Sequence, residues 1–127
     1  MTEGSDVTIV ATGHLVWKAL EAAKELLKVG IHAEVINIHT IKPLDTALLL
    51  SSIGKTGCVV TAEEHQRNGG LGDSVAQLLS QKLPVPMEYV AVNDQFGQSG
   101  TPSELMDVYG LNTSGIVDAA KKVILRK

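Results

Sequence analysis

The stretch VVTAEEHQRNGGLGDSVAQLL, residues 59–79, decides the fold that we predict for this chain. An apolar strand at residues 58–62 runs into a polar corner formed by Glu63, Glu64 and His65. A glycine-rich turn follows, and a helix begins after it. A strand that delivers carboxylates and a histidine to such a turn is typical of the carboxyl end of a parallel sheet, where ligands bind in α/β proteins. The stretch therefore predicts both the fold class and the place of a functional site.

The turn contains Gly69, Gly70 and Gly72, and two interpretations of these glycines are open. The first N–H groups of the helix point into the space beside the polar corner, so an anion or a partner's carboxylate could dock there. Alternatively, the glycines only let the helix start close to the strand ends, because close packing needs residues without a Cβ atom. We favour close packing over anion binding.

Composition limits the class of protein. The chain has 127 residues, 44% of them hydrophobic, and a net charge of −3, which predicts one soluble domain. Without a basic cluster there is no reason to expect a nucleic acid partner. No apolar run reaches the ~18 residues that span a membrane, so we expect no membrane partner and a cytoplasmic location. The single cysteine, Cys58, rules out an internal disulfide and is interpreted as a small buried hydrophobe.

Short apolar strands alternate with amphipathic helices along the chain. We expect strands at residues 7–11, 33–38, 58–62 and 87–92, and helices at residues 15–29, from 45 to 50 or 53, after the glycine turn, at 101–110, and from 112 or 113 to 125. This order predicts an α/β fold, a three-layer α/β/α arrangement with a mostly parallel sheet and right-handed crossovers. We expect the strand order 2-1-3-4.

Several local signals fix the ends of these elements. Gly30 is expected to cap the first helix, and Asp45 to begin the second, which Gly54 closes. Glu34 within the second strand suggests a position at the sheet edge. The whole chain, residues 1–127, is predicted to be a single domain with residues 1–6 as a tail.

The polar corner suggests a contact site rather than a catalytic or metal site. Adjacent residues of an extended segment point to opposite sides, so Glu63 and His65 can converge while Glu64 cannot join them. Two such ligands are too few for zinc, and we predict no metal site and no catalytic residue. In the order 2-1-3-4 the loops after strands one and three are neighbours, so we hypothesise that His14 and His65 line one crevice. The candidate anion or partner contacts are His14, Glu63, His65, Gly69, Gly70 and Gly72.

Known nucleotide and hydrolase motifs are missing. The turn after the first strand lacks the G-x-G-x-x-G fingerprint of dinucleotide binding, and no G-x-x-x-x-G-K-[ST] phosphate loop occurs. The G-x-S-x-G elbow of α/β hydrolases is also missing. These activities are therefore not expected.

A family resemblance covers nearly the whole chain. Its motifs are VTIVATG at residues 7–13, HTIKPLD at 39–45, VVTAEEH at 59–65, GGLG at 69–72 and QSGTPSELMDVYGL at 98–111. In this order they resemble the C-terminal domain of the transketolase family of thiamine-diphosphate enzymes. The same domain of 1-deoxyxylulose-5-phosphate synthase, or of 2-oxo-acid dehydrogenase β subunits, is the alternative. Residues 99–100 and 109–111 look more like transketolase than like the dehydrogenases.

The resemblance implies that the chemistry lies outside this chain. Transketolases move a two-carbon ketol unit between sugar phosphates, and their thiamine diphosphate and Mg²⁺ are bound by other domains. It implies that this chain binds no cofactor, is inactive alone, and has a structural, interface-forming role with other transketolase domains or a subunit, in a homodimer. The family's extra antiparallel edge strand is expected to be absent. The strand at residues 33–38 should then be covered by the tail or by another copy.

A different class of function stays open from the residues themselves. The chain could be a free-standing regulatory or anion-binding module that uses the glycine turn and the crevice of His14 and His65. Such a module would be stabilised by phosphate, whereas a structural domain would not.

Overall fold

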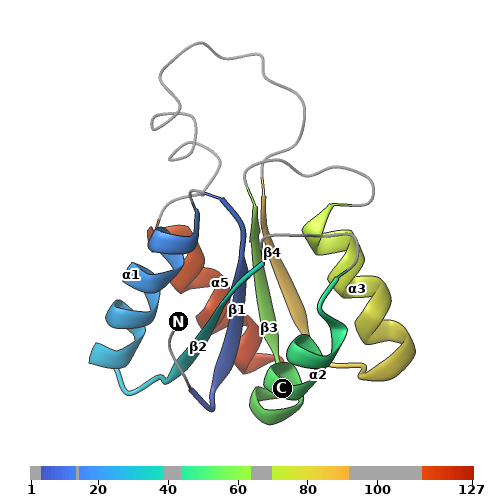
Figure 1. The fold of residues 1–127 in the computed structure, drawn as a ribbon. Coiled ribbons are helices and arrows are strands. Elements are labelled where there is room, and N and C mark those ends of the chain that lie inside the picture. Colours follow the sequence, from blue (N-terminus) through green and yellow to red (C-terminus); the bar gives the residue numbers. More distant parts are fainter. Residues whose placement is uncertain (1–3, 14, 39–43, 64–69, 92–112) are drawn as a thin grey trace.

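The computed structural model describes residues 4–13, 15–38, 44–63, 70–91 and 113–127. Strands and helices alternate along these residues (Figure 1). The elements are β1 (Val7–Ala11), α1 (Leu15–Lys28), β2 (Ala33–Asn37), α2 (Thr46–Thr56), β3 (Val59–Glu63), α3 (Leu71–Lys82), β4 (Met87–Ala91) and α5 (Thr113–Leu125). The strands form one parallel sheet in the order β2-β1-β3-β4, so the predicted topology is confirmed.

The sheet separates two hydrophobic cores, which gives the three layers. Helices α1 and α5 pack on one face, and α2 and α3 on the other (Figure 1). In β1, Ile9 faces the first core and Val10 the second, and both side chains are fully buried. Because helices cover both faces, β1 is apolar or buried at every position instead of alternating between apolar and polar residues.

The predicted caps at Gly30 and Asp45 are confirmed, but the predicted end of α2 is not. Gly30 adopts a positive φ of 82° and donates to the Leu27 carbonyl, while Ile31 N–H donates to Leu26, which is a Schellman ending. The Asp45 carboxylate accepts from Leu48 N–H, so the predicted N-cap is confirmed. The prediction that Gly54 closes α2 is wrong. The helix continues to Thr56, and Gly57 with a φ of 80° ends it.

The strand boundaries differ slightly from those predicted. β3 begins at Val59 and includes Glu63, because Glu63 pairs in register with Ala91 of β4. The predicted helix at residues 101–110 lies outside the described residues, as do His14, His65 and Gly69.

Strand β2 lies at one edge of the sheet, as its polar residues indicate. Asp6 N–H donates to the His32 carbonyl at 2.9 Å, and the Asp6 carboxylate accepts from His32 N–H at 2.7 Å. These bonds join the segments that lead into β1 and β2 at Asp6 and His32. Coverage of the outer edge of β2 by the tail or by another copy stays a prediction. No helix in the described part of the chain is long and apolar enough to cross a membrane.

Candidate functional site

The carboxyl end of β3 holds a buried charged side chain. Glu63 is 8% exposed, and its Oε2 accepts a hydrogen bond of 2.6 Å from the backbone N–H of Gly72. Gly70, the N-cap residue of α3, has no side chain that could cap the helix. The Glu63 carboxylate thus satisfies an N–H that the first turn of a helix leaves unpaired. Its negative charge also interacts favourably with the positive end of the helix dipole.

Gly72 lets α3 begin directly against β4. A Cβ atom at Gly72 would lie 2.5 Å from Cε2 of Tyr89 and 3.4 Å from Oγ1 of Thr61. Carbon atoms that are not bonded do not approach to 2.5 Å, so a side chain at this position requires the Tyr89 ring to move. The positive φ angles of the described glycines occur at Gly13, Gly30 and Gly57. Gly72 is therefore needed for space rather than for backbone conformation, which supports the close-packing interpretation.

Two carboxylates, those of Glu63 and Asp73, act on the Tyr89 phenol at this corner. Burial raises the pKa of the Tyr89 phenol, and the charges of Asp73 and Glu63 raise it further. The phenol therefore stays protonated at neutral pH and can donate a hydrogen bond. Because the Gly72 amide already binds Glu63, an incoming anion would have to compete with a carboxylate of the same chain. The described groups suit a partner that brings a hydrogen-bond acceptor for the Tyr89 hydroxyl.

The structure brings together three of the residues predicted for the site, namely Glu63, Gly70 and Gly72. The hypothesis that His14 and His65 share a crevice concerns residues outside the described part. Their described neighbours are close, because Thr12 N–H donates to the Ala62 carbonyl at 3.3 Å. The exits of β1 and β3 are thus adjacent, as the hypothesis requires.

Tyr89 and Thr61 complete the corner, and sequence reasoning missed both. Tyr89 alternates with buried Val90 along β4 and is 42% exposed. An aromatic residue in an edge strand is a weak signal, because its contact with Gly72 depends on how α3 crosses the sheet.

The amino end of the sheet is held by buried hydroxyl groups. Thr8 Oγ1 lies 2.9 Å from Ser52 Oγ and 2.7 Å from Thr56 Oγ1. The Thr56 hydroxyl also donates to the Cys58 carbonyl at 3.1 Å. Burial raises the pKa of the Cys58 thiol, which donates to the Asp6 carbonyl, so Cys58 has the structural role expected from the sequence.

An ion pair lies at the same end of the molecule. Lys55 Nζ is 2.6 Å from Glu34 Oε1. Burial alone would raise the pKa of Glu34, but hydrogen bonds from Lys55 and Ser52, the Lys55 charge and the Gly4 backbone together lower it. Glu34 is therefore ionised at neutral pH although it is 9% exposed.

The described residues do not fit a diphosphate bound through a metal ion. They contain no group of three or more His, Cys, Asp or Glu side chains that could hold a metal. The backbone amide of Gly72, in the first turn of α3, is bonded to Glu63. The described contacts of this corner hold α3 against the sheet.

Comparisons with known proteins agree with the resemblance seen in the sequence. A family profile described as "Transketolase, C-terminal domain" matches residues 1–116. The 6-deoxy-6-sulfo-D-fructose transketolase subunit SqwH of Clostridium sp. (strain MSTE9) is 49% identical over 127 residues, which are 100% of this chain and 39% of that protein. The 1-deoxy-D-xylulose-5-phosphate synthase 1 of Geobacter sulfurreducens is 37% identical over 129 residues, 100% of this chain and 20% of that protein.

A solved structure is similar over almost the same length. It is described as "Split gene transketolase, inactive beta4 tetramer" and is 50% identical, with a TM-score of 0.94. The match covers 99% of this chain and 41% of that chain. The chain thus spans about two fifths of the subunits that it matches, and a smaller share of the synthase.

Proposed function

The chain belongs to the transketolase C-terminal domain family, and from this premise we propose that it supports a transferase reaction whose reacting groups lie in other domains. In the intact enzyme a two-carbon ketol unit, glycolaldehyde, passes between sugar phosphates in the cytoplasm. Thiamine diphosphate and Mg²⁺ are bound by the other domains, and this domain is inactive alone.

The bond between Glu63 and Gly72 is the observation that supports this proposal most. Ligands of parallel α/β sheets bind at the carboxyl ends of the strands. At that end of this sheet the described carboxylate is buried and bonded to a helix amide, so it is used to hold the fold together.

The same corner is our proposed surface for a partner domain or subunit, within a homodimer of the intact enzyme. It comprises His14, Glu63, His65, Gly69, Gly70 and Gly72, the residues that the sequence analysis identifies. The adjacent exits of β1 and β3 support this choice. One relative is named as a transketolase subunit, and the similar solved structure is named as a split-gene transketolase. These names support a separate partner chain for this protein.

The test is a reconstitution of ketol transfer. This chain is mixed with a chain that contains the two other transketolase domains, in the presence of thiamine diphosphate and Mg²⁺. Transfer of the ketol unit to an aldose phosphate is measured with two donors. One donor is a ketose phosphate, and the other is a sulfonated ketose, because the 49% identical relative is named for such a sugar. We expect transfer by the mixture and none by this chain alone. Transfer by this chain alone would contradict the proposal.

Gly70 offers a test of the contact surface. Its φ of −74° and ψ of −174° are extended values that any residue adopts, so Gly70→Gln adds bulk without backbone strain. We expect assembly with the partner to weaken roughly tenfold, about 1.4 kcal/mol. Ser80→Gln, at the exposed far end of the same helix, is the matched control and should leave assembly unchanged. Equal effects of the two variants would place the contact elsewhere.

The alternative of a free-standing anion-binding module has a separate test. It requires helix amides that are open to phosphate, but the Gly72 amide is bonded to Glu63. We therefore expect inorganic phosphate to leave the melting temperature unchanged. A stabilisation of 2 kcal/mol would raise it by about 5–10 °C at this size, and such a rise would favour the module.

A further inference from the structure

Among the described strands, β4 lies at the second edge of the sheet, and its outer side presents backbone groups that could pair with another strand. It pairs with β3 and is last in the strand order. Val59 N–H of β3 donates to the Pro86 carbonyl at 3.2 Å. Because successive peptide groups of a strand point to alternate sides, the N–H and carbonyl of Met87 point away from β3, and so do those of Tyr89. Such outward groups are a template on which another chain can add a strand.

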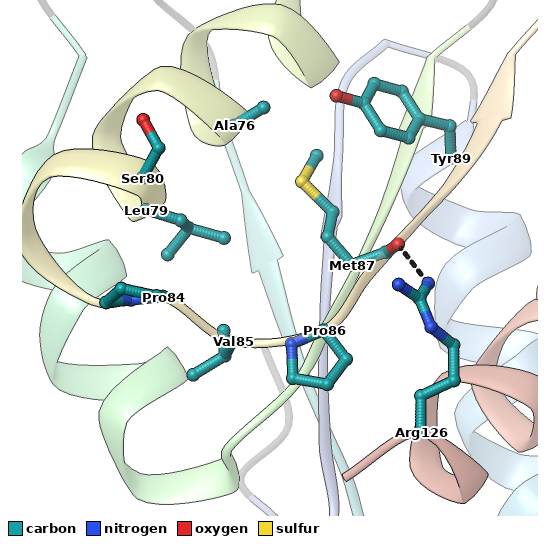
Figure 2. A pocket seen from close by; sticks show the side chains of 9 residues that line it. All are labelled: Ala76, Leu79, Ser80, Pro84, Val85, Pro86, Met87, Tyr89 and Arg126. Atoms are coloured by element: carbon teal, nitrogen blue, oxygen red, sulfur yellow. Dashed lines mark hydrogen bonds between the residues drawn. The ribbon is translucent and has the colours of Figure 1, made fainter.

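Arg126, which follows α5, covers this edge. Its Nη1 donates a hydrogen bond of 2.8 Å to the Met87 carbonyl, as Figure 2 shows. The same nitrogen is paired with the Glu88 carboxylate, and Lys122 Nζ lies 3.6 Å from the other oxygen of that carboxylate. The guanidinium is thus held by the neighbouring side chain while it occupies the outward acceptor of the strand.

The surroundings of the edge would otherwise favour strand addition. A hollow of about 540 Å³ lies between α3 and β4, and Leu79, Val85 and Met87 contribute apolar side chains to it (Figure 2). An edge strand beside apolar pockets is the surface to which extended peptides bind in strand addition. Pro84 and Pro86 lack N–H groups at the entry to β4 and shorten the usable edge. Arg126 therefore occupies the first outward carbonyl of the strand, where an added strand would have to bond.

We propose that Arg126 blocks strand addition at the outer edge of β4, and that without it two copies of the chain pair through these edges. A half-exposed ion pair contributes little to stability, so the main effect of Arg126 concerns what the edge can bind. This proposal does not depend on ketol transfer, and its test uses no activity.

The test compares the full chain with Arg126→Ala, Arg126→Lys and Lys122→Ala. Lys retains a donor for the Met87 carbonyl, and Lys122 contacts Glu88 without bonding to the β4 backbone in the described contacts. Mass is measured by light scattering over a range of concentrations, and amide hydrogen exchange is measured at Met87 and Tyr89. We expect R126A to show about a twofold rise in mass with concentration relative to the wild type, as a pair of copies requires. The two amides should become protected together with that rise, and R126K and K122A should behave as the wild type.

Two results would overturn the proposal. One is a folded R126A whose mass and amide exchange equal those of the wild type. The other is association of R126A that leaves the Met87 and Tyr89 amides unprotected, because the pairing would then involve another surface. If R126A does not fold, Glu88→Gln releases the guanidinium from its carboxylate while Arg126 remains. In E88Q the amides of Met87 and Tyr89 should become protected to a smaller extent than in R126A. Amide exchange in E88Q equal to that of the wild type would refute the blocking role of Arg126.

Discussion

The two ends of the sheet are held together by different chemistry. At the amino end, the neutral hydroxyls of Ser52 and Thr56 both bond to Thr8, and Thr56 also donates to the Cys58 carbonyl. At the carboxyl end, a single charged group, Glu63, binds the first turn of α3, and Gly72 lies against Tyr89 without room for a side chain. Among the described residues, the carboxyl end of the sheet thus depends on a buried carboxylate and on a glycine that leaves no space, whereas the amino end depends on neutral hydroxyls.

The largest effect should come from Glu63→Ala. It removes a carboxylate from a buried amide and from a helix N-terminus, which should lower the free energy of unfolding by about 3 kcal/mol. Glu63→Gln keeps an oxygen acceptor and loses only the charge, so it should cost about 1 kcal/mol. Urea unfolding of both variants measures the difference. Equal costs would mean that the hydrogen bond to Gly72 contributes nothing by itself.

The next largest effect should come from Gly72→Ala. The new Cβ would overlap the Tyr89 ring, and we expect a loss of about 2 kcal/mol. Gly54→Ala is the matched control, because Gly54 is an exposed position of α2 and its Cβ would meet only Leu83 Cδ2, at 3.7 Å. That control should raise the free energy of unfolding by about 0.5–1 kcal/mol. The double variant Gly72→Ala with Tyr89→Ala should cost less than the sum of the single changes, and exact additivity would disprove the clash.

A smaller effect is expected at the amino end from Thr8→Val. The substitution keeps the shape and removes the hydroxyl that contacts Ser52 and Thr56, at a cost of about 1.5 kcal/mol. Thr56 keeps its bond to the Cys58 carbonyl, which limits the loss. Ser51→Ala removes an exposed hydroxyl from α2, the helix that carries Ser52 and Thr56, and should leave the free energy of unfolding unchanged. A loss larger than that of Glu63→Ala would reverse the comparison between the two ends.

The smallest effect should come from Lys55→Met, and it should depend on pH. The Lys55 side chain is 49% exposed, so loss of its pair with Glu34 should cost only about 0.5 kcal/mol at pH 7. The pKa of Glu34 is lowered from its ordinary value of 4.5. Its stabilisation is therefore fully present above pH 4.5 and is lost as the pH falls through the lower folded-state pKa. The difference between wild type and variant should shrink in that acidic range, as measured by thermal melting.

Lys28→Ala is the control for this ion pair. Lys28 and Glu25 are 70% and 53% exposed, so their pair should contribute almost nothing at any pH. A difference between Lys55→Met and wild type that stays constant down to the acid range would contradict the assignment of the effect to Glu34.

The fold was accessible from the sequence because short apolar strands alternate with helical patterns, and this alternation leaves few topologies. The end of α2 could not be predicted from the sequence, because Gly54 and Gly57 are both glycines and either one is suited to end a helix. Burial of Ile53 and Thr56 continues the helix past Gly54, and burial is a property of the folded chain.

The candidate site was predictable in position but not in its contacts. The order of the motifs placed Glu63 and Gly72 at the same corner, as observed. The partner of Glu63 is a backbone amide, which every residue type possesses, so no sequence pattern identifies it. The need for glycine at residue 72 comes from Tyr89 on another element, and that contact exists only after α3 packs on the sheet.

We propose that this domain supports an enzyme whose cofactor is bound by other domains. The most direct test of this proposal is a calorimetric titration of thiamine diphosphate with Mg²⁺ into this chain alone, and into its mixture with a chain that contains the two other domains. We predict saturable binding by the mixture and none by this chain alone. Saturable binding by this chain alone would contradict the account.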